Sequence, residues 1–352
     1  MVYKELVSKS WYPLMSVLLG LFMGFFTTIF IGLNPLEVTY IFFTSLASRE
    51  SIIQMLISFP ACLFCALSFL LTFRSGVFNF GTPGQYVLGA LFAAVFGIFL
   101  DLPPIINVPL VLLMGALGGA LWAIPPAILK WKREVNEIIT TLLLSFVAPI
   151  LGIYVAKLPG IKDPERVNII ATLPINESAK LPSIVPGSGV NTGLILALVM
   201  AFLLYIFLWK TSIGVRIRAT GLNPLAATYC GINTERVMLL AFVLSGGLAG
   251  FGGACYILGV SHAYYARTFL GLSGYGLSGL VAAFLGGMHP IGAIFSSFFF
   301  SMLTVGGLML NIRARVPVDY VVLIQGLILG FVAMPLLMKK MLGGKALRMV
   351  GT

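Results

Sequence analysis

The side chains able to perform catalysis are few and scattered in this sequence. The two histidines, His262 and His289, lie far apart and lack acidic neighbours, so they do not form a metal-binding pattern. No serine or cysteine has a recognisable base partner. The stretch Gly343-Gly344-Lys345 lacks the earlier glycine and the following Ser or Thr of a phosphate-binding loop. The sequence therefore predicts that the chain is not an enzyme and carries no metal or cofactor of its own.

A second group of residues is suited to binding a solute. Gly81, Pro83 and Gly84 disfavour a continuous helix, and backbone that leaves a helix can offer its polar groups to a ligand. Amide and phenyl groups interleave beside them, which suits an uncharged, ring-containing solute. A tight turn between two helices is the open alternative. The segment reads Phe78-Asn79-Phe80-Gly81-Thr82-Pro83-Gly84-Gln85.

The composition indicates that these residues are positioned by helices in a membrane. Hydrophobic residues make up 59% of the 352 residues and charged residues 9%, and the mean hydropathy is +1.04. A soluble domain has about 45–50% and about 25% respectively, so a soluble enzyme and a disordered chain are both excluded. The net charge of +11 comes from basic residues placed singly between apolar runs. That pattern is typical of cytoplasmic loops rather than of nucleic-acid binding.

Runs without Asp, Glu, Lys or Arg mark the candidate spans, because a spanning helix needs about 20 apolar residues. The run 268–312 is too long for one span and is broken near Gly286-Gly287 and His289-Pro290, so it predicts two. The fold class is an all-α polytopic membrane protein with about ten transmembrane segments, some broken or re-entrant, and a weak internal repeat. The runs are 10–36, 51–73, 75–100, 102–129, 138–156, 181–209, 237–266, 268–312 and 320–338.

The distribution of Lys and Arg sets the expected orientation. Ten crossings with a cytoplasmic N-terminus place most basic residues inside, as the positive-inside rule requires. The chain 1–352 is then one membrane-spanning domain with an external loop at 157–192 and a long cytoplasmic loop at 210–236. The N-terminal stretch 1–10 and the tail 339–352 are both expected in the cytoplasm.

The cytoplasmic loop 210–236 predicts a short helix that stands outside the membrane. Asn223 followed by Pro224 reads as a cap and a first helical residue, and Gly231 reads as a stop. Such a helix, with small residues exposed on one side, has too little apolar area to form a core. It could fit the groove of a partner, or it could be an ordinary connector.

The spans lack the ionisable residues that ion-coupled transporters use. Glu137 and Asp319 lie at the ends of their segments, and the interiors of the spans contain essentially no acid. A transport protein of this kind needs energy from another chain. A stand-alone channel or ion-coupled carrier is the alternative class.

Several of these motifs together resemble a known family. The loop Gly214–Ile232 followed by Ala241–Gly250 is similar to the permease subunits of ATP-binding-cassette (ABC) importers of the branched-chain amino acid, simple sugar and nucleoside class. The segment Phe78–Gln85 with Gly89-Ala90 resembles the nucleoside-type members, although Thr82 and Pro83 replace their Ala and Glu. Matches also occur at Val135–Thr141 and at Gly274–Gly276 to Pro290–Gly292.

The resemblance implies a function and partners. It implies a permease subunit in the bacterial cytoplasmic membrane that carries a nucleoside, with a purine nucleoside favoured; riboflavin, a simple sugar or another neutral solute is the alternative. It also implies a second permease subunit, an extracytoplasmic solute-binding protein, and a cytoplasmic ATPase that holds the ATP and Mg. The implied substrate-path residues are Phe78, Asn79, Phe80, Gln85, Asn136 and Glu137, and the implied coupling-helix residues are Gly221, Asn223, Pro224, Ala226, Ala227, Tyr229 and Gly231.

Overall fold

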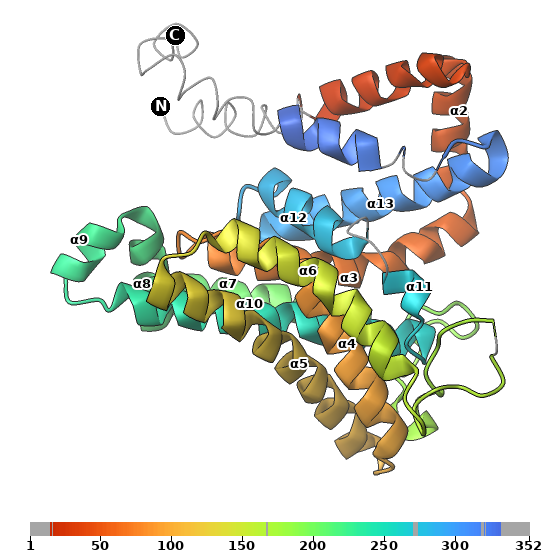
Figure 1. Ribbon diagram of the computed structural model, residues 1–352. Helices are drawn as coiled ribbons and strands as arrows, with labels where there is room; N and C mark the ends of the chain where they lie inside the picture. Colours follow the sequence, from red (N-terminus) through yellow and green to blue (C-terminus); the bar gives the residue numbers. More distant parts are fainter. Residues whose placement is uncertain are drawn as a thin grey trace, which may run out of the picture. The chain divides into compact units, whose positions relative to one another are not determined.

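The computed structural model describes residues 15, 17–166, 168–269, 274–317, 320 and 322–331 (Figure 1). The predicted cytoplasmic ends, 1–10 and 339–352, lie outside this range. The chain divides into two compact units, which are described separately: unit 1 is Met1–Ile52 with Met302–Thr352, and unit 2 is Ile53–Ser301. Within the described ranges, the regular elements are helices, accompanied by isolated β-bridges.

The helices follow the apolar runs of the sequence. They are η1 (Thr27–Ile31), α2 (Pro35–Leu46), α3 (Arg49–Phe73), α4 (Thr82–Phe99), α5 (Pro104–Arg133), α6 (Glu137–Ala156), η2 (Glu177–Ala179), α7 (Gly193–Lys210), α8 (Ser212–Leu222), α9 (Pro224–Tyr229), α10 (Thr234–Tyr256), the π-helical turn η3 (Ile257–Ser261), α11 (Ala266–Phe269), α12 (Tyr275–Leu285) and α13 (Pro290–Ala314).

The described residues contain seven helices long and apolar enough to cross a membrane: α3, α4, α5, α6, α7, α10 with its continuation to Ser261, and α13. Three shorter apolar helices, Val17–Phe30, α12 and Val322–Phe331, coincide with other predicted spans. The predicted count of about ten and the internal repeat are therefore not confirmed. The long run 268–312 does divide between α12 and α13, as expected from its glycines and Pro290.

Close helix packing in unit 2 depends on glycine. Helix α10 packs extensively on both α4 and α5. A Cβ at Gly250 of α10 would overlap the carbonyl of Gly115 on α5, and a Cβ at Gly119 would overlap the carbonyl of Gly246. Only glycine lets the backbones of α5 and α10 approach this closely.

We expect the substitution Gly250→Ala to destabilise the protein by about 1–3 kcal/mol, because its methyl group would be forced into the backbone of α5. Gly247→Ala is the matched control on the same helix, since its Cβ would meet Ala116 and Ala120 at 3.7 and 3.9 Å, which is ordinary contact. Thermal unfolding of both purified variants in detergent measures the difference. Equal midpoints would contradict the packing described.

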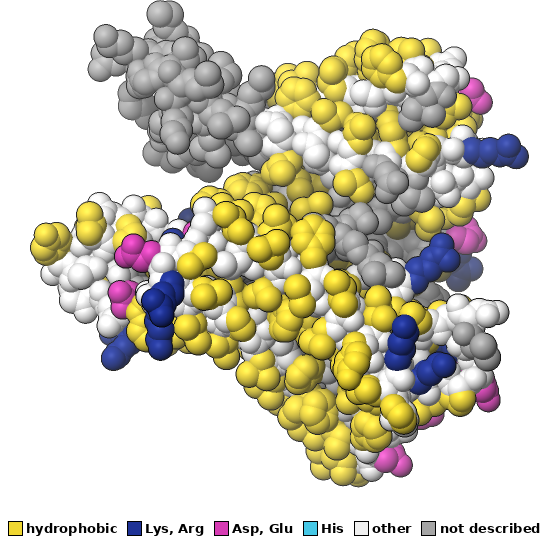
Figure 2. Space-filling view, viewed as in Figure 1, with side chains coloured by type: hydrophobic (Ala, Val, Ile, Leu, Met, Phe, Trp, Pro, Cys, Tyr) yellow, Lys and Arg dark blue, Asp and Glu magenta, His cyan; other side chains and the backbone are white. Residues whose placement is uncertain are grey.

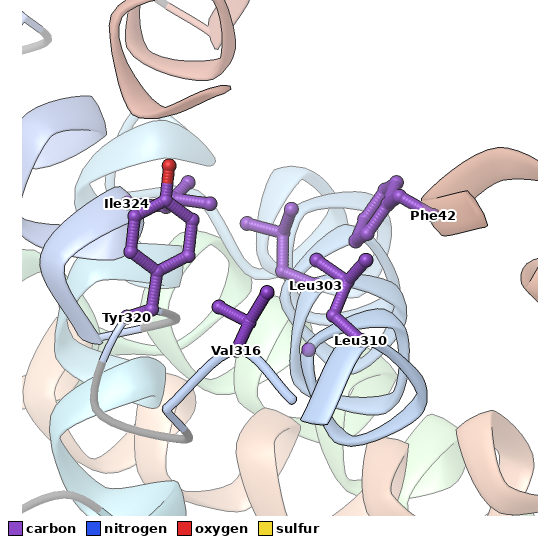
Figure 3. A pocket seen from close by; sticks show the side chains of 7 residues that line it. Phe42, Leu303, Leu310, Val316, Tyr320 and Ile324 are labelled. Carbon is purple, nitrogen blue, oxygen red and sulfur yellow. The ribbon is translucent and has the colours of Figure 1, made fainter. Parts of the chain in front are cut away.

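Unit 1 packs by the same means. In the helix Val17–Phe30, Gly20 packs against the side chain of Ile328 and Gly24 packs against the side chain of Ile324. Phe42 of α2 lies against Gly306 of α13 and is almost fully buried. Figure 3 shows Phe42 directed toward α13, in a small apolar pocket that is also lined by Leu303, Leu310, Val316, Tyr320 and Ile324.

The surface of unit 2 is apolar along its long helices. Large hydrophobic side chains are exposed on α5 and α6, among them Leu113 and Leu117, Leu143 and Ile150. Figure 2 shows hydrophobic side chains covering this face, with Lys and Arg nearer the α8–α9 end and the loop after α6. An exposed apolar surface of this extent is suited to lipid or to another membrane-embedded chain.

Candidate solute path and coupling site

The polar core of the candidate path is a closed pair of amides. Asn79 is fully buried, and its Nδ2 donates to Gln85 Oε1 and to Ser245 Oγ, both at 2.9 Å. Its Oδ1 accepts from the backbone N–H of Gly81 at 2.9 Å and from Gln85 Nε2 at 3.2 Å. Both predicted polar residues therefore bind each other in this conformation rather than facing an open path.

Hydroxyl groups extend this network to three helices. Ser245 Oγ of α10 donates to the carbonyl of Ser68 on α3 at 2.8 Å. Ser68 Oγ lies 2.9 Å from Ser245 Oγ and 3.4 Å from Thr82 Oγ1 of α4. Ser68 and Ser245 were not predicted as site residues from the sequence. Ser245 stands inside the motif Ala241–Gly250, but nothing local identifies its partner.

The predicted aromatic residues of the path lie together in a phenylalanine cluster. The rings of Phe78 and Phe80 are stacked with centroids 6.5 Å apart. Phe78 contacts Phe73 at 5.4 Å, and Phe80 contacts Phe69 at 6.0 Å. Both predicted residues are half-buried, so each keeps an exposed portion beside the amide network.

The break between α3 and α4 lies earlier in the chain than Gly81, Pro83 and Gly84 predict. Helix α3 ends at Phe73 and α4 begins at Thr82, so Pro83 and Gly84 belong to the first turn of α4. A proline is accepted there because the first turn leaves its N–H groups unpaired anyway. Only Gly81 of the three predicted breakers lies outside the helix.

Arg74 anchors the start of this turn. Its Nε and Nη2 both donate to the carbonyl of Met288, which precedes α13. Burial, and then the charge of Arg218, lower the pKa of Arg74 from its usual value. The guanidinium lies 5.3 Å from the ring centre of Trp209, which Arg218 also approaches at 5.5 Å.

Asn136 and Glu137 hold the start of α6. Asn136 is exposed and caps the helix, with its Oδ1 accepting from the N–H of Ile138 at 2.9 Å. Glu137 forms an ion pair with Lys130 of α5 at 2.9 Å. Further along α6, Ser145 Oγ donates to the carbonyl of Phe80 at 3.1 Å. Helix α6 therefore contacts the segment that contains Asn79.

The loop 210–236 contains the short helix that the sequence predicts. Helix α9 begins at Pro224, capped by Asn223, whose Oδ1 accepts from the N–H of Ala226 at 3.1 Å. Gly231 has φ +80°, the left-handed conformation that favours glycine at a helix stop. In Figure 1, α9 lies at the far end of unit 2 from the loop 157–192.

The exposed side of α9 differs from the expectation of small residues. Leu225 is 75% exposed and Tyr229 is 93% exposed, and Leu222 before the helix is 88% exposed. Ala226 is exposed as predicted, whereas Ala227 is only 4% exposed and packs inward. The accessible face of this helix therefore carries large apolar side chains.

The two candidate sites meet at two glycines. A Cβ on Gly221 at the end of α8 would overlap the carbonyl of Arg74, and its position lies 3.0 Å from the N atom of Gly76. Gly76 has φ +84° and faces the Cα of Gly221. The backbone of the loop 210–236 therefore packs directly against the turn that leads to Asn79.

These features define a helical membrane protein in which the end of α8, just before the short helix α9, packs against the turn that leads to Asn79. A family model described as "Branched-chain amino acid transport system / permease component" matches residues 51–333, and the chain belongs to this family. The match extends into both compact units.

Characterised relatives share most of the chain. It is 29% identical to the nucleoside ABC transporter permease protein NupB of Lactococcus lactis subsp. cremoris, over 94% of this chain and 92% of that protein. It is 31% identical to the glucose ABC transporter permease protein TsgB13 of Haloferax volcanii, over 91% and 86%. It is 30% identical to the guanosine ABC transporter permease protein NupP of Bacillus subtilis, over 76% of each chain.

Proposed function

We propose that this permease forms the translocation path for a nucleoside, with a purine nucleoside favoured. Family membership makes the chain an ABC importer permease, and relatives named for nucleosides and for guanosine cover 94% and 76% of it. The half-buried rings of Phe78 and Phe80 offer flat apolar faces of the kind that a base stacks on. An extracytoplasmic binding protein delivers the solute.

A simple sugar is the second candidate solute. The relative named for glucose is 31% identical over 91% of this chain, which is as similar as the nucleoside relatives. Nucleoside-type members carry Ala and Glu where this chain has Thr82 and Pro83. This difference keeps riboflavin and other neutral solutes as further candidates. Competition among these solutes for uptake distinguishes them.

The coupling helix is α9, and its partner is a cytoplasmic ATPase that binds the ATP and Mg. This assignment rests on one observation. Leu225 and Tyr229 form an exposed apolar face on α9, and this helix is too short to form a hydrophobic core by itself. Such large apolar side chains are typical anchors of protein interfaces. Gly221, Pro224 and Gly231 shape the loop that presents them.

Movement of α9 reaches the path through backbone contact. The backbone of Gly221, at the end of α8, packs closely against the carbonyl of Arg74 and against Gly76. The turn that contains Arg74 and Gly76 leads into Asn79. The Asn79–Gln85–Ser245 network fastens the turn to α4 and α10. A shift of the loop therefore strains or releases the network, while Asn136 and Glu137 border the same end of the path on α6.

The remaining parts of the importer follow from this assignment. A second permease subunit, identical or homologous, completes the path in the cytoplasmic membrane, and both termini lie in the cytoplasm. Purification from native membranes in mild detergent, followed by mass spectrometry, tests the assembly. We expect an ABC ATPase in stoichiometric amount; recovery of the intact chain alone in good yield would contradict it.

A further inference from the structure

Four aromatic rings from four different helices meet in unit 2. They are Tyr86 of α4, Tyr256 of α10, Phe269 of α11 and Tyr275 of α12. Tyr86 lies 6.5, 6.1 and 6.4 Å from the other three ring centres in that order, and Tyr256 lies 5.9 Å from Tyr275. We call these four residues the tyrosine cage. Rings gathered from separate helices can part and re-form when the helices move.

The cage holds a buried polar group without a partner. The hydroxyl of Tyr86 is buried, and no atom among the described residues forms a hydrogen bond with it. A buried hydroxyl in this state destabilises the fold, so native proteins rarely retain one. Tyr264, whose ring stacks on Phe269 at 4.7 Å, has a second hydroxyl of this kind. A ligand that enters between the cage rings would find a hydrogen-bonding partner in the Tyr86 oxygen.

The position of the cage in the path fits uptake. Tyr256 is followed directly by the π-helical turn Ile257–Ser261, an irregularity that is frequent at functional sites. The next residues bind the loop 157–192: Ile175 N donates to the carbonyl of His262, and Thr172 N to the carbonyl of Tyr264. The cage thus lies toward the loop expected outside the membrane, at the opposite end of α10 from α9.

We propose that the tyrosine cage is the site where the permease receives the base of its nucleoside. A planar base replaces the contacts that the rings now make with one another, and the Tyr86 hydroxyl bonds to a polar edge of the base. Stacking selects a flat heterocycle, and the hydroxyl selects one with hydrogen-bonding edges. The proposal rests on the proposed function, because it specifies the solute of that path.

Kinetics of nucleoside uptake by the assembled importer test the proposal. Tyr256→Leu removes a stacking face and is expected to raise the KM for labelled guanosine about tenfold. Tyr86→Phe keeps the ring and removes only the unpartnered hydroxyl, and is expected to raise KM about fivefold without lowering thermal stability. Tyr154→Leu on α6, where Tyr154 is 65% exposed, is the matched control and should leave KM unchanged.

The outcomes separate the cage from the proposed function. If the wild type takes up guanosine while Tyr86→Phe and Tyr256→Leu keep its KM, the cage assignment is overturned and the nucleoside path stands. If the wild type takes up no nucleoside, the proposed function fails and the cage assignment falls with it. Should Tyr256→Leu fail to assemble, Tyr86→Phe decides, because a purely structural hydroxyl without a partner predicts greater stability and unchanged uptake.

Discussion

The double substitution Leu225→Glu with Tyr229→Glu is expected to abolish ATP-driven uptake while the permease still folds and reaches the membrane. Both side chains are largely exposed, so neither change disturbs the packing of unit 2. In the importer they would place two unpaired charges in the ATPase groove, which costs several kcal/mol and should weaken association more than about 100-fold. Co-purification of the ATPase and uptake by the same cells measure both effects.

Lys132→Glu is the matched control for this experiment, because Lys132 is also exposed, lies at the same end of unit 2 and is outside α9. Asn223→Arg should have a milder effect, since it removes a helix cap and adds charge at the edge of the same face. Ala227→Trp is unsuitable, because Ala227 is buried and a large ring would unfold the loop itself. Normal ATPase binding by the double variant would remove α9 from the coupling role.

Asn79→Leu is expected to lower the free energy of unfolding by about 3 kcal/mol and to eliminate uptake. The substitution leaves the Gln85 amide and the Gly81 N–H without their partner in a buried site, whereas the Ser245 hydroxyl keeps its contacts with Ser68. Thermal unfolding in detergent, together with the amount of chain in the membrane, measures the loss.

Asn136→Ala is the control for Asn79→Leu, since it removes an exposed cap worth about 1 kcal/mol. Gln85→Leu should have a smaller effect, because Asn79 then loses one amide partner but keeps its hydrogen bonds to Ser245 and to the Gly81 N–H. If Asn79→Leu were as stable as Asn136→Ala and kept the uptake of the wild type, the buried network would have no part in closing the turn.

Features with a local cause could be predicted from the sequence. Asn223, Pro224 and Gly231 set the two ends of α9 through capping and backbone preference, and the structure has this helix. The break before Pro290 likewise follows from the residues at that place.

Features that depend on tertiary contacts could not be predicted. Asn79 reads as an open ligand group in the sequence, yet its partner Ser245 stands 166 residues away. The spacing of Ala226 and Ala227 does not tell which of them faces the rest of the loop. The tyrosine cage draws on four helices, so no local pattern marks Tyr86 and Tyr256 as neighbours.

Uptake by the purified importer, with its ATPase and binding protein, in lipid vesicles tests the central claim most directly. The account predicts that labelled guanosine accumulates only with hydrolysable ATP, and that excess unlabelled nucleoside suppresses this uptake while excess glucose does not. Accumulation of glucose in place of guanosine, or guanosine entry without ATP, would contradict it.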